Sequence, residues 1–338
     1  MTLLNLDRRS LIKSAGLAAV AGATASSGFV QPVFAQTAAG TAAGTTASPF
    51  PSRPVANRFM VGAFEVTTIF DGAVQLDGPH PIFGANVDAA EVMKLAEENF
   101  LPGSKMEIGF TPTVIRNGGN TILFDSGNGD STGRRPNAGN LVQNMALIGI
   151  KAEDVTHVLL THFHPDHIGG LVEGGKTTFP NAVYVANAAE YDFWIADERL
   201  SGPTERVGKL VQSNVKPFAE KFTFIKPGDS VVSGLTAIDA SGHTPGHTAY
   251  HIEDGGERVL LIGDACNHYV VSLQRPDWHV RFDMDKEKAV QTRKSLLGMI
   301  AADKIPFIGY HMPFPSVGYV APKGDSFKYE PASYQLYL

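Results

Sequence analysis

The stretch "THFHPDHIGG", residues 161–170, decides the fold. Four side chains of the metal-ligand type fall within six of its positions: His162, His164, Asp166 and His167. Alternate residues of a strand share one face, so a His-x-His pair leaving the apolar run 156–162 can point both rings the same way. Pro165 then ends the strand and lets the next residues turn onto a loop. Ligands so close in sequence suit two adjacent metal ions, each completed from elsewhere in the chain.

Three later segments each carry a coordinating side chain just past a predicted buried strand. "SGHTPGHTAY", 241–250, supplies His243 and His247, while "VLLIGDACNH", 259–268, supplies Asp264. "IPFIGYHMPFP", 305–315, supplies His311 at the end of another apolar run. Loops at strand ends are where sheet proteins commonly display functional groups. The segments therefore provide the ligands that the first cluster lacks.

In this order the motifs resemble the metallo-β-lactamase superfamily, and the likeness spans about residues 60–320. Asp125 in "ILFDSG" matches the family's first motif, an aspartate near a strand end ahead of the cluster. The resemblance implies an α/β fold with a single domain, built as an αββα sandwich with a metal pair at one edge of its sheets. "FPNAVYVANAAEYDFW" and "FKYEPASY" are most similar to the methyl parathion hydrolase-like branch.

Carried over by motif, the resemblance implies a ligand set for two ions. It assigns His162, His164 and His247 to one ion, Asp166, His167 and His311 to the other, and Asp264 as the bridge between them. Within "GHTPGH" the family pattern selects His247, which leaves His243, like Asp125, as a supporting residue beside the ligands. His164 stands where the oxygen-reducing di-iron branch has a glutamate, which favours zinc over redox iron.

The implied chemistry is hydrolysis at two divalent metal ions. A hydroxide shared by the two ions would attack a carbonyl carbon or a phosphorus, and the second ion would stabilise the developing oxyanion. Asp264 and Asp166 are the expected catalytic residues, because either carboxylate could relay a proton to the leaving group. No organic cofactor is needed for such a reaction.

Aromatic residues after the cluster are candidates for a substrate wall. "AAEYDFWIAD", 188–197, puts Phe193 and Trp194 on a predicted helix, and Trp194 stands where the branch has a pocket tryptophan. Phe314 is a further candidate, because ligand pockets are mostly apolar with a few polar groups. Core packing is the alternative for all three side chains.

The residues after Asp264 offer one more pocket candidate. If the strand that ends there continued, positions 264, 266 and 268 would share a face, and His268 would line the pocket. Cys266, the single cysteine of the chain, is expected to be a small buried thiol rather than a reactive group.

The first 55 residues are not expected to belong to the fold. Residues 1–35 contain the pair Arg8-Arg9, a weakly apolar stretch and a small-residue end at Ala35, which together resemble a twin-arginine export signal. The stretch is too weakly apolar for a stable membrane anchor. Residues 36–55 then form a low-complexity tail, and residues 56–338 form the hydrolase domain. The protein is therefore expected in the periplasm.

The rest of the chain alternates short strands and helices, which favours one layered α/β domain. Helices are predicted at 88–99, 141–150, 187–197 and 286–302. Two strands within 111–127 are joined by a turn at Asn117-Gly118-Gly119. Further strands are predicted at 63–70, 156–162, 181–186, 222–225, 235–239, 248–252, 258–263 and 305–311.

The predicted function is hydrolysis of an ester-like bond in a small hydrophobic substrate: a phosphotriester, an aryl ester or a lactone. An acyl-homoserine lactone (quorum-quenching) lactonase is the alternative, and a non-catalytic periplasmic metal-binding protein is the alternative of a different class. The chain has 28 basic and 34 acidic residues and no strongly basic region, which disfavours a nucleic-acid partner. No basic residue is identified that would hold a β-lactam carboxylate. A homodimer is implied by the branch likeness alone.

Overall fold

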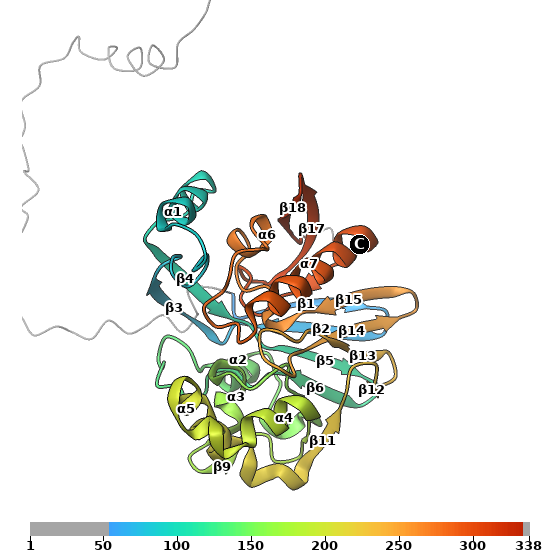
Figure 1. The fold of residues 1–338 in the computed structure, drawn as a ribbon. Helices are drawn as coiled ribbons and strands as arrows, with labels where there is room; N and C mark the ends of the chain where they lie inside the picture. The colour runs from blue at the N-terminus through green and yellow to red at the C-terminus, as the bar shows by residue number, and fades with distance from the viewer. Residues whose placement is uncertain (1–53, 334–338) are drawn as a thin grey trace, which may run out of the picture. The chain divides into compact units, whose positions relative to one another are not determined.

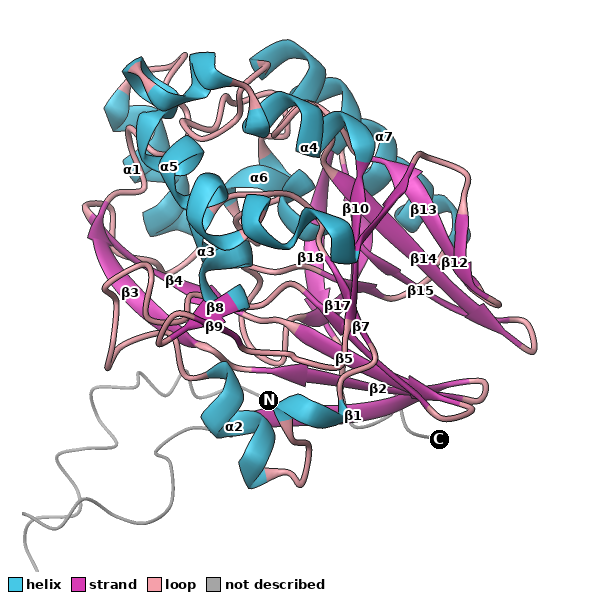
Figure 2. Cartoon of the chain, turned by 90° about the horizontal axis from the view of Figure 1, so that it is seen from below, coloured by secondary structure: helices cyan, strands magenta, loops and turns pink. Residues whose placement is uncertain are grey.

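The computed structural model describes residues 54–333. The export signal expected at 1–35 and all but the last two residues of the tail expected at 36–55 lie outside this part. Figure 1 shows two sheets stacked face to face with helices on their outer faces, and Figure 2 shows further helices gathered along one edge of the sheets. The αββα sandwich is confirmed.

The first sheet has seven strands in the order β1-β2-β5-β6-β7-β10-β11. Its strands β6, β7, β10 and β11 are parallel. Gly118 and Gly119, with φ of 56° and 93°, form the predicted turn between β5 and β6. The bounds are β1 Ala56–Val61, β2 Phe64–Ile69, β5 Thr113–Asn117, β6 Asn120–Phe124, β7 His157–Leu159, β10 Val183–Asn187 and β11 Phe222–Ile225.

The second sheet also has seven strands, in the order β12 to β18, and only β15 and β16 run parallel. Its bounds are β12 Ser230–Val232, β13 Leu235–Asp239, β14 Thr248–Asp254, β15 Glu257–Leu261, β16 Phe307–Ile308, β17 Val317–Lys323 and β18 Ser326–Pro331. Two small antiparallel strand pairs stand apart: β3 Gly72–Asp77 with β4 Lys105–Phe110, and β8 Val172–Glu173 with β9 Lys176–Thr177.

Three layers of core hold the sandwich together. Apolar side chains of both sheets, such as Val66 and Tyr250, meet between them, while Met145 and Val211 pack helices onto the first sheet and Leu297 packs α7 onto the second. The helices are α1 Ala89–Glu98, α2 Leu141–Leu147, α3 Pro165–Ile168, α4 Ala188–Ile195, α5 Glu205–Asn214, α6 Val271–Gln274 and α7 Lys286–Asp303. Single 3-10 turns lie at Ala152–Asp154, Gly169–Leu171, Asp197–Leu200, Gly202–Thr204, Lys216–Lys221 and Gly263–Ala265.

Two of the four predicted helices begin at a side-chain cap, whereas α1 and α2 have none. The Asp285 carboxylate accepts the backbone N–H of Lys288 at the start of α7, and the Asn187 side chain accepts that of Ala189 at the start of α4. Helix α5 and the hairpin β17–β18 were not predicted, and the strand predicted at 305–311 is only two residues long. No helix within residues 54–333 is long and apolar enough to span a membrane.

Candidate metal centre

The polar side chains of the predicted site all follow strand ends. Asp125 comes directly after β6, His162 after β7, His243 after β13, Asp264 after β15 and His311 after β16. Each strand is buried, and each loop brings its polar residue to the same edge of the sandwich. The structure thus brings together segments that lie up to about 190 residues apart in the chain.

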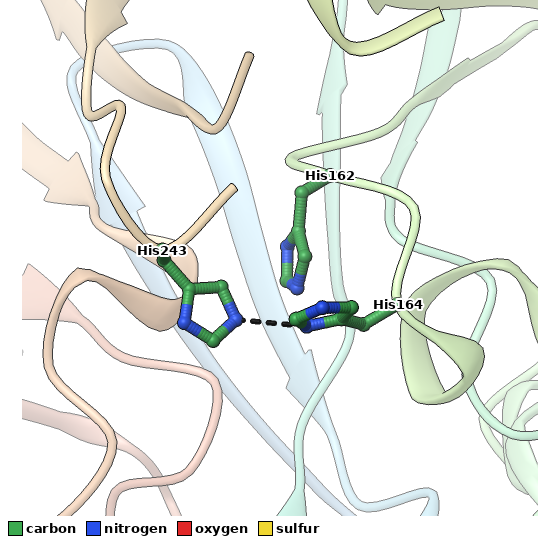
Figure 3. A group of neighbouring side chains, drawn as sticks. All are labelled: His162, His164 and His243. Atoms are coloured by element: carbon green, nitrogen blue, oxygen red, sulfur yellow. Dashed lines mark hydrogen bonds between the residues drawn. The ribbon is translucent and has the colours of Figure 1, made fainter. Parts of the chain in front are cut away.

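One triad of rings consists of His162, His164 and His243, whose nitrogens lie within 4.8 Å of one another. Figure 3 shows His243 reaching from its own loop toward the two histidines of the first cluster. Nε2 of His243 is 2.9 Å from Nδ1 of His164. Burial lowers the pKa of His164 to about 3 and that of His162 well below its usual value. The neutral rings of His162 and His164 can therefore offer lone pairs to a cation.

A second triad consists of Asp166, His167 and His311. The Asp166 Oδ2 atom lies 3.7 Å from Nε2 of His167 and 3.6 Å from Nε2 of His311. Burial would raise the pKa of Asp166, but the two neighbouring rings hold it below its usual value. The carboxylate is therefore charged and able to serve as a ligand.

Asp264 lies between the two triads. Its Oδ2 is 3.1 Å from Nε2 of His311 and 3.4 Å from Nε2 of His243, and its Oδ1 is 3.3 Å from Nε2 of His167. Asn267 fixes the carboxylate by donating Nδ2–H to Oδ2 at 3.0 Å. Burial would raise the pKa of Asp264, but the rings of His311 and His167 hold it well below its usual range. This arrangement has the geometry that a bridging carboxylate needs.

Partners on the far side of three rings set which nitrogen faces the centre. His167 Nδ1 lies 2.8 Å from Asp125 Oδ2, His243 Nδ1 lies 2.8 Å from Asp283 Oδ1, and His311 Nδ1 lies 2.8 Å from the carbonyl of Gly109. Each partner is an acceptor, so each Nδ1 carries a proton and each Nε2 is the nitrogen turned toward the centre. Burial would lower the pKa of His167 and His311, but the carboxylates beside them raise it, so a metal that binds there displaces a proton from Nε2. Asp125 was predicted from the sequence, whereas Asp283 was not.

The residues present fit two metal ions. Three buried atoms at this centre lack any hydrogen-bond partner among the described residues: His162 Nε2, His167 Nε2 and Asp264 Oδ1. Buried polar atoms without partners are costly, so their convergence on one place indicates a ligand that satisfies all of them. Imidazole nitrogens with carboxylate oxygens are a donor set for zinc and similar ions. The ligand roles themselves remain predictions.

The structure does not bring the predicted ligand His247 into either triad, and His243 lies in the place expected for it. Both ring nitrogens of His247 have protein partners: Nδ1–H donates to the carbonyl of Ala240 at 2.9 Å, and Nε2 accepts the backbone N–H of Asp264 at 3.0 Å. No lone pair is left for a metal. A Cβ at Gly263 would lie 2.7 Å from this Nε2, so only glycine allows the contact. His247 therefore holds the backbone of the bridging residue in place.

Glu190 is a second buried acid that the sequence did not reveal. Its Oε1 accepts the backbone N–H of Phe163 at 2.9 Å and the indole N–H of Trp194 at 2.8 Å, and its Oε2 accepts the backbone N–H of Gly246 at 2.9 Å. Phe163 lies between the two histidines of the first loop, and Gly246 lies in the turn after His243. One carboxylate therefore ties the two ligand-bearing loops together.

A cavity of about 470 Å³ opens onto the two triads. Trp194 lines it, as predicted, but Phe193, Phe314 and His268 are not among its lining residues. Phe193 packs on the Trp194 ring, Phe314 packs on Phe70, and His268 packs on Phe83 and accepts backbone N–H groups through Nδ1. The apolar wall comes instead from Leu76, Phe83, Ile108, Phe110, Val207, Phe282 and Met284.

The prediction for His268 failed because the strand does not continue through Asp264. β15 ends at Leu261, and Gly263–Ala265 forms a 3-10 turn that breaks the alternation of faces. Cys266 is buried, as expected, and its burial raises the thiol pKa to about 12. The sequence also failed to identify basic residues near the site, since Arg134, Arg206 and Arg281 line the cavity.

A sandwich of two sheets with seven histidine and aspartate side chains at one edge defines a class of metal-dependent proteins. Residues 111–302, more than half of the chain, match the family model described as the metallo-beta-lactamase superfamily. The chain belongs to this superfamily.

Three similar proteins give the family likeness more detail. A probable metallo-hydrolase of Mycobacterium tuberculosis is 37% identical over 131 residues, which cover 36% of this chain and 40% of that protein. An N-acyl homoserine lactonase of a Bacillus species is 27% identical over 173 residues, covering 50% of this chain and 61% of the lactonase. The chain thus matches about two fifths to three fifths of these relatives' lengths. The solved structure of AidC, a dizinc quorum-quenching lactonase in complex with a product, superposes with a TM-score of 0.77 at 28% identity, covering 82% of this chain and 98% of AidC.

Proposed function

We propose that the protein is a binuclear metal-dependent hydrolase that opens lactones and cleaves aryl esters. The observation that carries this proposal is Asp264, whose two oxygens reach both triads at the floor of a largely apolar cavity. A shared carboxylate between two ligand triads suits a pair of ions that act together on one bond. The likeness to AidC supports a lactone substrate.

Two zinc ions are the proposed metals, one held by His162, His164 and His243, the other by Asp166, His167 and His311. When bound, such a pair supplies a nucleophile at neutral pH and stabilises negative charge that develops on the substrate. The chain's own groups do the remaining work. Asp264 and Asp166 stay charged and accept a proton during the reaction, and the apolar wall excludes water from the cleaved bond.

The phosphotriester activity implied by the methyl parathion hydrolase-like branch is the second candidate. The cavity's apolar wall of Phe83, Phe110 and Phe282 favours it, because such side chains suit an aromatic leaving group. The named relatives are lactonases and probable metallo-hydrolases, so lactones stand ahead of phosphotriesters in this proposal.

A substrate panel tests the proposal. Acyl-homoserine lactones of several chain lengths, 4-nitrophenyl esters and a paraoxon-type triester are assayed with zinc-loaded and chelated protein, alongside a metal analysis. We expect lactone and ester turnover that chelation removes and zinc restores. Two bound metals with no turnover on any substrate would instead support a non-catalytic metal-binding protein.

We also propose that the mature protein acts in the periplasm, on the basis of Arg8-Arg9 and the segment that follows. Cell fractionation of the wild type and an Arg8→Lys/Arg9→Lys variant tests this proposal. Export of both proteins through the general secretion route, or retention of both in the cytoplasm, would contradict a twin-arginine signal.

A further inference from the structure

The arginines that line the cavity have no acidic partners. Among residues 54–333, neither Arg134, nor Arg206, nor Arg281 forms an ion pair with a carboxylate. Other arginines of the chain do form such pairs: Arg58, Arg116, Arg135, Arg258 and Arg293. The whole chain has 34 acidic and 28 basic residues, so three arginines without an ion pair around one cavity are unusual for this protein.

The acids that line the same cavity already have other partners. Asp166 and Asp264 belong to the metal centre. Asp283 accepts N–H groups from His243 and from Arg293, both at 2.8 Å, and is fully committed to them. No carboxylate of residues 54–333 forms an ion pair with the three cavity arginines, although the charge of Arg134 helps to lower the pKa of Asp166, so their charges are available to a ligand.

Arg134 is the arginine that the structure holds most firmly at the cavity. Its Nη1–H donates to Asn128 Oδ1 at 2.6 Å, and its guanidinium carbon lies 4.8 Å from the centre of the Phe110 ring. Asn128 in turn donates backbone and side-chain N–H groups to the buried carboxylate of Asp71, which also accepts the backbone N–H of Gly139. The loop that carries Arg134 is therefore held by Asp71 at both of its ends, Asn128 and Gly139. This fixed loop preorganises the guanidinium group for binding.

An apolar wall combined with arginines suits a molecule with an alkyl chain and an anionic end. The planar guanidinium binds a carboxylate through two parallel hydrogen bonds, which gives direction as well as affinity. We propose that the cavity takes esters or lactones whose acyl chain ends in a carboxylate, with that group held by Arg134 and, at the exposed rim, by Arg206 and Arg281. This inference rests on the proposed function, because it places the reacting bond at the metal centre.

A matched pair of substrates tests the inference. 4-Nitrophenyl hexanoate and the mono-4-nitrophenyl ester of adipic acid have the same leaving group and chain length, but only the second ends in a carboxylate. We expect the zinc-loaded wild type to have the higher kcat/KM for the adipate ester. Arg134→Gln lowers the ratio of the two kcat/KM values about tenfold, in line with one charge-assisted hydrogen bond, and Arg206→Gln and Arg281→Gln lower it less because both side chains are exposed.

Arg275→Gln is the matched control, because Arg275 is exposed, forms no ion pair among the described residues and does not line the cavity. The ratio stays at the wild-type value in this variant. A wild-type preference for the hexanoate ester, or an Arg134→Gln ratio equal to that of the wild type, would overturn the inference.

A binding measurement separates this inference from the proposed function. Adipate and hexanoate are titrated calorimetrically into zinc-loaded wild type and Arg134→Gln, which requires no turnover. Tighter binding of adipate in the wild type, reduced in the variant, supports the carboxylate site even if neither ester is hydrolysed. Equal affinities for the two acids in both proteins overturn the carboxylate site, whatever the esterase assay gives.

Discussion

The substitution Asp125→Asn isolates the role of a single proton at the metal centre. The Asp125 carboxylate accepts three groups: the backbone N–H of Thr161 at 2.8 Å on Oδ1, the Thr161 hydroxyl at 2.9 Å, and Nδ1–H of His167 at 2.8 Å on Oδ2. Asparagine keeps the shape but replaces one acceptor with an NH₂ donor. Asp125 has φ of 61°, a conformation that asparagine also tolerates, so the backbone need not change.

Every arrangement of the new side chain is unfavourable. In one arrangement the asparagine oxygen keeps the bond to the backbone N–H of Thr161, and the asparagine NH₂ faces Nδ1 of His167. Two donors cannot face each other, so the ring proton must move to Nε2. This is the atom that lies 3.3 Å from Asp264 Oδ1. That nitrogen then has no lone pair for a metal. If the amide is flipped, a buried backbone N–H loses its acceptor, at a cost of about 1–3 kcal/mol. Loss of such a supporting partner commonly weakens metal binding about 10–100-fold, or about 1.4–2.7 kcal/mol.

Competition with a chelator, followed by metal analysis, measures this effect. We expect Asp125→Asn to lose one of two zinc equivalents at a chelator concentration about 10–100-fold lower than the wild type, with turnover falling in parallel. Asp192→Asn, which removes the same charge from an exposed position on α4, is the control and matches the wild type. Two tightly held zinc ions and full turnover in Asp125→Asn would refute the tautomer argument.

Five further substitutions test the site and the residues around it. Asp264→Ala abolishes turnover and lowers the zinc content, since it removes the contact common to both triads; wild-type activity with both metals retained would exclude the bridging role. His243→Ala loses about one zinc per chain while His247→Ala keeps both, and metal analysis showing the reverse would restore His247 as a ligand. Trp194→Phe removes the N–H bonded to a buried acid, and we expect a higher KM for aromatic esters with a small change in kcat; unchanged kinetics would assign the ring to the core. Burial lowers the pKa of His268 to about 4, so between pH 6.5 and 4 the unfolded chain binds the extra proton and stability falls as the pH falls. In His268→Asn the free energy of unfolding of the metal-free protein should therefore change less between pH 6.5 and 4, by at most about 3 kcal/mol. Urea titrations at several pH values measure it, and the same pH dependence in the variant and the wild type would contradict the prediction.

The first cluster and the strands around it could be predicted because their signals are local. In residues 156–167 a short apolar strand is followed at once by polar ligand-type side chains. Both features can be predicted from these residues alone, without knowing what contacts them. The same holds for β15 before Asp264 and for α7, whose predicted range of 286–302 differs from the observed end by one residue. Helix α5 is amphipathic, with Val207, Leu210 and Val211 packed on the core of the first sheet, so its signal was present in the sequence and was overlooked.

The arginines of the cavity could not be predicted from the sequence for a different reason. Arg134, Arg206 and Arg281 lie in three separate segments, and nothing near them in the chain marks them as functional. They differ from the other arginines in lining the cavity without an ion pair to a carboxylate, and both properties become visible only in three dimensions. Asp283 was missed likewise, because the histidine that it orients lies 40 residues away.

The choice between His243 and His247 shows what a one-dimensional motif leaves undecided. Both rings are buried, and they are four residues apart in one turn, so residue type and spacing suit either of them. The difference lies in what the ring nitrogens face: Nε2 of His243 lies beside His164 and Asp264 at the centre, whereas both nitrogens of His247 bond to backbone groups. Its second partner is the backbone of Asp264, a residue on another strand's loop. The two histidines therefore have different roles: His243 turns one nitrogen toward other ligand-type side chains, while His247 holds the backbone of Asp264, and only the partners of each nitrogen distinguish them.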